Sequence, residues 1–275
     1  MEITSAQNPR IKQLLALQQK SQERRREGLF VVEGQRELMH CMNAGYEVVS
    51  LFVREEKTAK SEGCAAATSL LANTAEANSS FFTLPSFLYE KVAYRGSTEG
   101  VIAIVRQKCL RLDDLQLSAQ PLIVVLEGVE KPGNLGAVMR SADAAKADAV
   151  IVCDPLTDLF NPNLIRSSIG AVFTVPAVAC SSEECIAFLK QRGIRILTAQ
   201  LQDSHLYYDT DMQQPTAIVM GTESTGLTRQ WRQAADAHIR IPMLGRLDSL
   251  NVSVSAAILL FEAVRQREAT WTERG

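Results

Sequence analysis

Short apolar runs alternate with helix-like segments through the second half of the chain. The first run, LIVVLEGV at 122–129, is apolar at almost every position, which is typical of a strand buried on both faces of a parallel sheet. Further runs follow along the chain, namely AVIVCD, VFTVPAV, GIRILTA, TAIVMG and AHIRIP. Strands that alternate with helices predict a parallel sheet. We therefore expect an α/β domain, closed by a nearly all-apolar helix at 251–268.

A second, smaller α/β domain is predicted ahead of this one. Four strand-like runs, LFVV, EVVSLFV, FFTL and GVIAIV, alternate with helical patterns that include an amphipathic stretch at 10–27 and an alanine-rich stretch at 62–72. The polar stretch at 109–121 ends in proline and is interpreted as a linker. We accordingly divide the chain into a domain of residues 1–110 and a domain of residues 120–275.

Composition excludes several classes of protein. A net charge of -2 predicts no strongly basic nucleic-acid binder, although RNA binding needs only a local basic face. The six cysteines include no C-x-x-C pair, so neither a disulfide framework nor a zinc site is expected, and no metal is predicted. The N-terminus lacks a signal-type apolar core, and no apolar run approaches roughly 18 residues. These features favour a cytoplasmic protein without a membrane span.

Polar residues gather where the predicted strands and helices of the second domain begin or end. Asn134 lies between a strand and a helix, and Arg140 follows within that helix. Glu223 follows the strand TAIVMG, and Ser249 and Asn251 precede the final helix. Each has an ordinary interpretation: Asn134, Ser249 or Asn251 as a helix cap, Arg140 and Glu223 as solvated side chains. Loop positions of this kind also carry function in many proteins.

The glycines at 221 and 226 have the spacing of a phosphate-binding loop, G-x-x-x-x-G. The lysine and serine or threonine that should follow are replaced by Leu227 and Thr228. Without the lysine, a nucleotide hydrolase is disfavoured. A glycine at a strand end, such as Gly221, instead suits close approach of the backbone to a ligand.

Taken in order, these segments resemble the SpoU/TrmH branch of the SPOUT RNA methyltransferases. Asn134 and Arg140 match the motif N-x-G-x-x-x-R, and Gly221, Glu223 and Gly226 match G-x-E-x-x-G. The third motif is matched by Ile241, Pro242, Ser249, Leu250 and Asn251. Ala145-Lys146 departs from the aromatic-glycine pair of many members. The N-terminal Q-N-P-R-I-K and F-V-V-E-G-Q-R-E resemble, more loosely, an L30e-like RNA-binding domain.

The resemblance implies a ribose 2′-O-methyltransferase that uses S-adenosylmethionine, with a trefoil knot in its C-terminal domain. The catalytic residues that it implies are Asn134, Arg140, Glu223, Ser249 and Asn251. The implied cofactor-binding residues are Thr198, Ala199, Gly221, Ile241, Pro242 and Leu250. Arg140 would act either as the base, together with an RNA phosphate, or as a bidentate clamp on that phosphate.

RNA is the expected partner, and ribosomal RNA is favoured over transfer RNA because enzymes on ribosomal RNA carry a similar extra domain. The best basic cluster is Arg24, Arg25 and Arg26, interpreted either as phosphate contacts or as a solvated helix end. Two alternatives stay open: a transfer-RNA methyltransferase, and a non-catalytic RNA-binding or ribosome-assembly protein on the same scaffold. The final helix is apolar around most of its circumference, which favours a homodimer.

Overall fold

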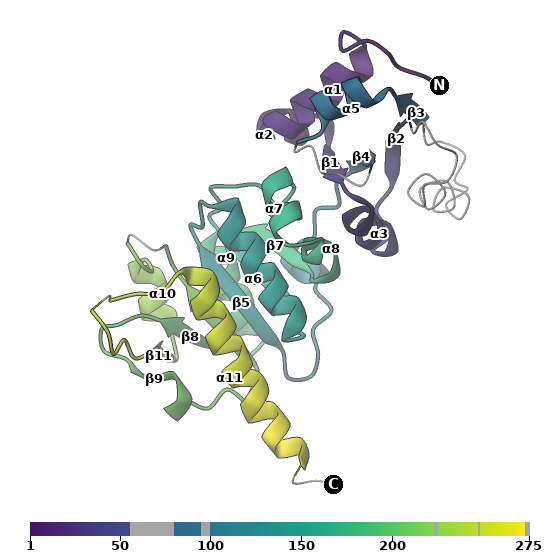
Figure 1. The fold of residues 1–275 in the computed structure, drawn as a ribbon. Coiled ribbons are helices and arrows are strands. Elements are labelled where there is room, and N and C mark those ends of the chain that lie inside the picture. Colours follow the sequence, from purple (N-terminus) through teal and green to yellow (C-terminus); the bar gives the residue numbers. More distant parts are fainter. Residues whose placement is uncertain (56–79, 95–99, 223–224, 247, 273–275) are drawn as a thin grey trace. The chain divides into compact units, whose positions relative to one another are not determined.

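The computed structural model describes residues 1–55, 80–94, 100–222, 225–246 and 248–272 of the chain. They form two compact units (Figure 1), of which the first comprises Met1–Lys108 with Phe160–Thr174 and the second Cys109–Leu159 with Val175–Gly275. The predicted alanine-rich helix at 62–72 lies outside the described residues. Segment 160–174 falls within the predicted domain 120–275, yet it packs as part of the first unit.

The first unit is built on a four-stranded mixed sheet with the order β1-β4-β2-β3. Strand β4 runs antiparallel to both β1 and β2, whereas β2 and β3 are parallel. The strands are β1 (Leu29–Glu33), β2 (Val48–Arg54), β3 (Ser80–Leu84) and β4 (Val101–Arg106), which are the four predicted runs. The helices are α1 (Pro9–Gln19), α2 (Ser21–Glu27), α3 (Gln35–Asn43), α5 (Ser86–Val92), α7 (Pro162–Ser167) and α8 (Ala171–Thr174).

The prediction of one strand, at 172–178, is partly wrong. The sequence predicts a strand over VFTVPAV at 172–178, but helix α8 extends to Thr174 and β7 begins only at Ala177. Phe173 packs in the first unit, where its ring centroid lies 5.9 Å from that of Phe30 and 5.3 Å from that of Tyr46. β-Branched residues favour strands only weakly. Aromatic packing therefore decides the structure of this segment.

The second unit is a seven-stranded, wholly parallel sheet with the order β7-β6-β5-β10-β8-β11-β9. This confirms the predicted α/β class. The strands are β5 (Leu122–Glu127), β6 (Ala149–Cys153), β7 (Ala177–Cys180), β8 (Arg195–Ala199), β9 (His205–Leu206), β10 (Thr216–Met220) and β11 (Ala237–Arg240). The helices are α6 (Pro132–Ala144), α9 (Ser182–Gln191), α10 (Arg229–Ala234), α11 (Val252–Thr272) and the 3-10 turns η1 (Leu112–Asp114) and η2 (Tyr207–Asp209).

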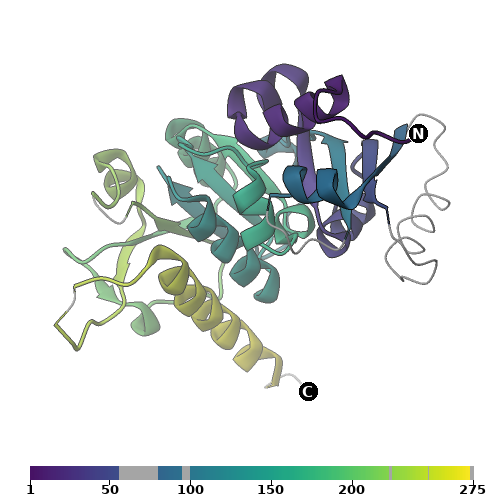
Figure 2. The ribbon, with the colours of Figure 1, turned by 45° about the horizontal axis from the view of Figure 1, so that its top comes forward.

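The strand order brings together loops that lie far apart in the sequence. Strand β10 pairs with β5 on one side and β8 on the other, so the loops that follow these strands meet at one edge of the sheet. Helix α6 starts in the loop after β5, and α11 lies alongside α6 in Figures 1 and 2. The side chains of α9 and α10 pack on alternate residues of the central strands. No described helix is long and apolar enough to cross a membrane.

Candidate active site

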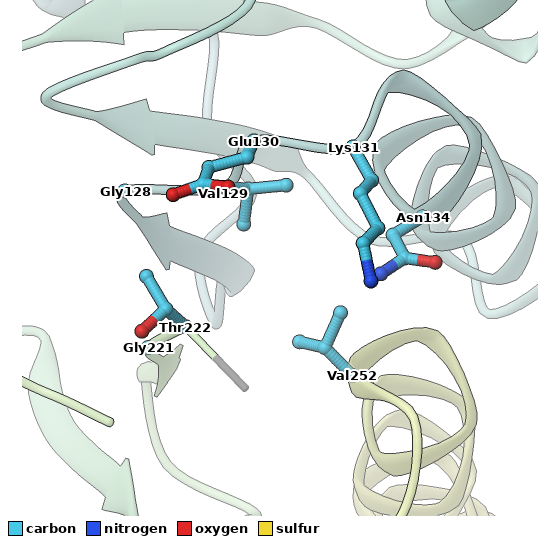
Figure 3. A pocket seen from close by; sticks show the side chains of 8 residues that line it. All are labelled: Gly128, Val129, Glu130, Lys131, Asn134, Gly221, Thr222 and Val252. Carbon is cyan, nitrogen blue, oxygen red and sulfur yellow. The ribbon is translucent and has the colours of Figure 1, made fainter. Parts of the chain in front are cut away.

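A small hollow lies between the ends of β5 and β10 and the start of α11. Its volume is about 170 Å³, and Figure 3 shows the residues that line it. The side chains of Lys131 and Asn134, at the start of α6, converge toward Val252 at the start of α11. The rest of the lining comes from the two loops: Gly128, Val129, Glu130, Gly221 and Thr222.

Asn251 connects the first and third sequence motifs. Its Nδ2 donates a hydrogen bond of 3.2 Å to Asn134 Oδ1. Its own Oδ1 accepts from the Ser253 backbone N–H at 2.9 Å and from the Ser253 hydroxyl at 2.6 Å. An acceptor one residue before a helix that bonds the second helical N–H is an N-cap. The ordinary interpretation of Asn251 as a cap is therefore correct, and the same side chain also contacts Asn134.

A larger cavity of about 380 Å³ lies beside this hollow, between the ends of β8 and β10 and the first turn of α11. It has the size of pockets that hold small molecules. Four of the predicted residues line it: Ala199, Gly221, Ser249 and Leu250. Gln200 lines it too, and its Oε1 is buried without a hydrogen-bond partner among the described residues.

Gly221 is required at its position by the crowding of the local backbone. A Cβ atom there would lie 2.3 Å from the backbone C and O of Gly226 and 2.6 Å from the N of Leu227. The loop closes through a hydrogen bond of 3.0 Å from Gly226 N–H to Thr222 O, and Gly226 has a φ of +65°. The close approach that excludes a side chain therefore comes from the chain's own backbone.

Three other predicted cofactor residues have different surroundings. Thr198 is buried, and its Oγ1 lies 2.6 Å from His238 Nδ1 on the neighbouring strand β11, so this side chain connects two strands. Ile241 and Pro242 line a separate hollow of about 500 Å³ with Arg240 and Arg246. The 380 Å³ cavity is thus formed without these three side chains.

Arg140 lies apart from the other predicted catalytic residues. It is exposed on α6, and its side chain forms no hydrogen bond or ion pair with any described residue. Six residues along a helix correspond to a rotation of about 240° beyond a full turn, so Arg140 and Asn134 point in different directions. Arg140 lines neither of the two cavities. Glu223, the remaining predicted catalytic residue, lies outside the described residues.

The predicted basic cluster is only partly available to RNA. Arg24 is 2% exposed, and its Nη1 donates to the carbonyls of Leu17 at 2.6 Å and Gln18 at 3.3 Å. Those carbonyls belong to the last turn of α1, so Arg24 is a structural residue. The Nη2 atom of Arg26 forms ion pairs with Glu23 and Glu27. Arg25 is exposed.

Glu127 is a residue of this region that the sequence reasoning missed. It ends β5 and is 4% exposed. Its carboxylate accepts from the Thr228 backbone N–H at 2.8 Å, from the Thr228 hydroxyl at 2.7 Å and from the Ser182 hydroxyl at 3.3 Å. Thr228 follows the loop that lines the cavity, so Glu127 fixes the far end of that loop to the sheet. The sequence signal that could have identified Glu127 is an acidic residue at the end of an otherwise apolar run.

Comparison with known proteins decides the family. The model of the SpoU rRNA Methylase family matches residues 121–261, and that of the MRM3-like substrate binding domain matches residues 8–103. The chain belongs to the SpoU rRNA methylase family. It is 31% identical to the 23S rRNA (uridine(2479)-2′-O)-methyltransferase of Streptomyces viridochromogenes, over 96% of this chain and 92% of the relative. It is 38% identical to the 23S rRNA (guanosine-2′-O-)-methyltransferase RlmB of Ralstonia nicotianae, over 62% and 70% respectively.

Solved structures of RNA methyltransferases match nearly the whole chain. A crystal structure of an RNA 2′-O ribose methyltransferase has a TM-score of 0.82 and 38% identity, covering 98% of this chain and 100% of the other. An AdoMet-bound rRNA methyltransferase from Sinorhizobium meliloti has a TM-score of 0.87 and 28% identity, covering 96% and 97%. The predicted family, fold class and enzyme class, an S-adenosylmethionine-dependent RNA methyltransferase, are thereby confirmed.

Proposed function

We propose that this protein transfers the methyl group of S-adenosylmethionine to a ribose 2′-hydroxyl of ribosomal RNA. The observation that carries the proposal is the contact between Asn251 and Asn134, which joins two motifs beside the Gly221 loop. The names of the relatives favour ribosomal RNA over transfer RNA. Methyl transfer needs the nucleophile and the donor held in line, and positioning of this kind can supply much of the rate.

The 380 Å³ cavity is the proposed cofactor site. The buried Oε1 of Gln200 supports this assignment, because a buried acceptor without a partner costs about 1–3 kcal/mol. S-Adenosylmethionine carries amino, ammonium and hydroxyl donors that can supply the missing hydrogen bond. When bound, the cofactor supplies an electrophilic methyl group. Ala199, Gly221 and Leu250 would enclose it, and Ser249 would offer a hydroxyl.

Arg140 is proposed to act on the RNA phosphate, as base or as clamp, within a homodimer. Its exposure and its lack of described partners suit a side chain that meets its ligand outside its own subunit. Val254 and Phe261 of α11 are 46% and 49% exposed and lie two turns apart on one face of the helix. An exposed apolar stripe of this kind suits a second copy. Arg140 of one subunit would then complete the site of the other.

Mixing two inactive variants tests the shared site. Arg140→Ala and Asn134→Ala should each abolish methyl transfer as homodimers. After unfolding and refolding together, about a quarter of the possible sites should regain activity, because one heterodimer site carries both intact residues. Mixtures as inactive as the separate variants, with heterodimers present by mass spectrometry, would contradict a site that is shared between subunits.

The first unit is proposed to hold the RNA, supported by its match to a substrate-binding domain model. The whole proposal is tested by mapping 2′-O-methylation in all RNA extracted from the cytoplasm of cells with and without the gene. One ribosomal site should lose its methyl group when the gene is removed. Loss of a transfer-RNA methyl group would favour the first alternative, and an unchanged map would favour a non-catalytic assembly protein.

A further inference from the structure

Three cysteine thiols meet at the outer edge of the parallel sheet in the second unit. Cys153 ends β6, Cys180 ends the edge strand β7, and Cys185 lies in α9. Their sulfur atoms all lie within 4.8 Å of one another. Cys153 and Cys180 are directly paired in the register of the two strands. Cys153 and Cys185 are buried, whereas Cys180 is partly exposed.

The spacing of the sulfurs suits coordination of one ion. A zinc ion bound to thiolates at about 2.3 Å holds the sulfur atoms about 3.8–4.0 Å apart, so small side-chain rotations are enough to close the site. A disulfide between Cys153 and Cys180 is also geometrically open, because paired strands lie about 4.8 Å apart. A disulfide uses only two of the three sulfur atoms, however, and does not account for the position of the third, Cys185 Sγ, beside them.

The surroundings favour sulfur as the sole kind of protein ligand. The nearest carboxylates are committed elsewhere: Glu184 accepts from the Ser181 N–H and hydroxyl, and Asp154 accepts from the Ser182 hydroxyl. Soft thiolate ligands select soft ions such as Cu⁺ and Zn²⁺.

We propose that Cys153, Cys180 and Cys185 form a three-sulfur binding site for a thiophilic d¹⁰ ion, Zn²⁺ or Cu⁺, separate from the methyl-transfer site. The ion would link β6, β7 and α9, and it would enter on the partly exposed side of Cys180. The sheet order separates this site from the cofactor cavity, which lies at β10 and β8 beyond β5. The proposal is independent of the proposed function and reverses the expectation that the protein binds no metal.

Cadmium titration of the full-length protein tests the site. Cd²⁺ reports thiolate binding by an ultraviolet charge-transfer band, and the protein is first reduced and stripped of metal without oxygen. The band should saturate at one ion per chain. Cys180→Ser and Cys185→Ser should each lose at least about ten-fold in affinity, because a ligand is removed. Cys109→Ser is the matched control, because Cys109 is exposed and outside the cluster, and it should bind as the wild type does.

Competition with Zn²⁺ and Cu⁺ then identifies the ion, and X-ray absorption of the loaded wild type counts its ligands without any variant. Three sulfurs per ion and a raised Tm on loading are expected. A wild-type band absent under reducing conditions, a band unchanged in Cys180→Ser, or fewer than three sulfurs per ion would overturn the proposal. So would a Cys153–Cys180 disulfide formed with peroxide in a protein whose reduced form takes up no Cd²⁺, since the cluster would then be a redox pair.

Discussion

Asn251 donates a hydrogen bond to Asn134 across 117 residues of sequence. The same Asn251 side chain caps α11 through Ser253, so one amide orients the start of the last helix and touches the first turn of α6. Helix capping and site assembly are therefore coupled at this residue. A change at Asn251 should disturb both, and the two effects can be separated.

Asn251→Ala should lower stability by about 1 kcal/mol through the lost cap and should lower methyl transfer far more. The matched control is Asn161→Ala, which removes the N-cap of α7 in the first unit. Thermal unfolding and initial rates, measured side by side, separate the effects. Equal activity of the two variants would mean that the Asn251–Asn134 contact has no part in the reaction.

Gly221→Ala should weaken S-adenosylmethionine binding by at least about ten-fold, or roughly 1.4 kcal/mol. The added Cβ would lie 2.3 Å from the Gly226 backbone, so the loop that lines the cavity must move. Gly133→Ala is the control, because a Cβ there meets nothing within 4 Å. Calorimetry with both variants measures the difference, and an unchanged dissociation constant for Gly221→Ala would refute the role of this loop.

Glu127 should act as a positioning residue for the cofactor loop. Glu127→Gln weakens two acceptor contacts to Thr228, and we expect the KM for S-adenosylmethionine to rise while kcat stays near that of the wild type. Ser182→Ala removes the 3.3 Å contact to Glu127, together with the Ser182 contacts to Asp154 and Trp231, but leaves Thr228 held. It should lower Tm without changing KM. If the KM for S-adenosylmethionine is the same as in the wild type for both variants, Glu127 has only a structural role.

The neighbouring arginines of α2 should behave differently when each is replaced. Arg24→Ala should destabilise the first unit by about 1–3 kcal/mol, since buried carbonyls lose their donor. Arg25→Ala should leave Tm unchanged and weaken RNA binding, with a salt dependence reduced by about one phosphate contact. Filter binding over a range of salt concentrations checks this. Identical salt slopes for Arg25→Ala and wild type would exclude Arg25 from the RNA surface.

The sequence predicts those features that depend on local pattern. The run at 122–129 is apolar on both faces, and most of it becomes β5, an interior strand of the parallel sheet. Several of the polar and loop residues predicted at element ends come together, because parallel strands deliver their carboxyl ends to one edge: Asn134 contacts Asn251, and Ser249 and Gly221 line one cavity. Strand β9, of two residues, is too short to leave a pattern.

Features that depend on tertiary contacts escape the sequence. Nothing in the basic run around Arg24 reveals that its guanidinium caps α1. The segment at 172–174 becomes helical because Phe173 packs near Phe30. The three cysteines of the cluster lie on different elements, and Cys153 and Cys180 are 27 positions apart in the sequence. The pairing of β6 with β7 brings Cys153 and Cys180 together, and the packing of α9 on the sheet adds Cys185.

The most direct test of the account is the product of the purified enzyme. Wild-type protein is incubated with S-adenosylmethionine carrying a labelled methyl group and with unmodified ribosomal RNA, and the RNA is digested to nucleosides for mass spectrometry. We predict a single 2′-O-methylated nucleoside from the wild type and none from Arg140→Ala, whereas Arg192→Ala, which changes an exposed arginine at the end of α9, should behave as the wild type does. A methyl group on a base, or equal transfer by Arg140→Ala, would contradict the account.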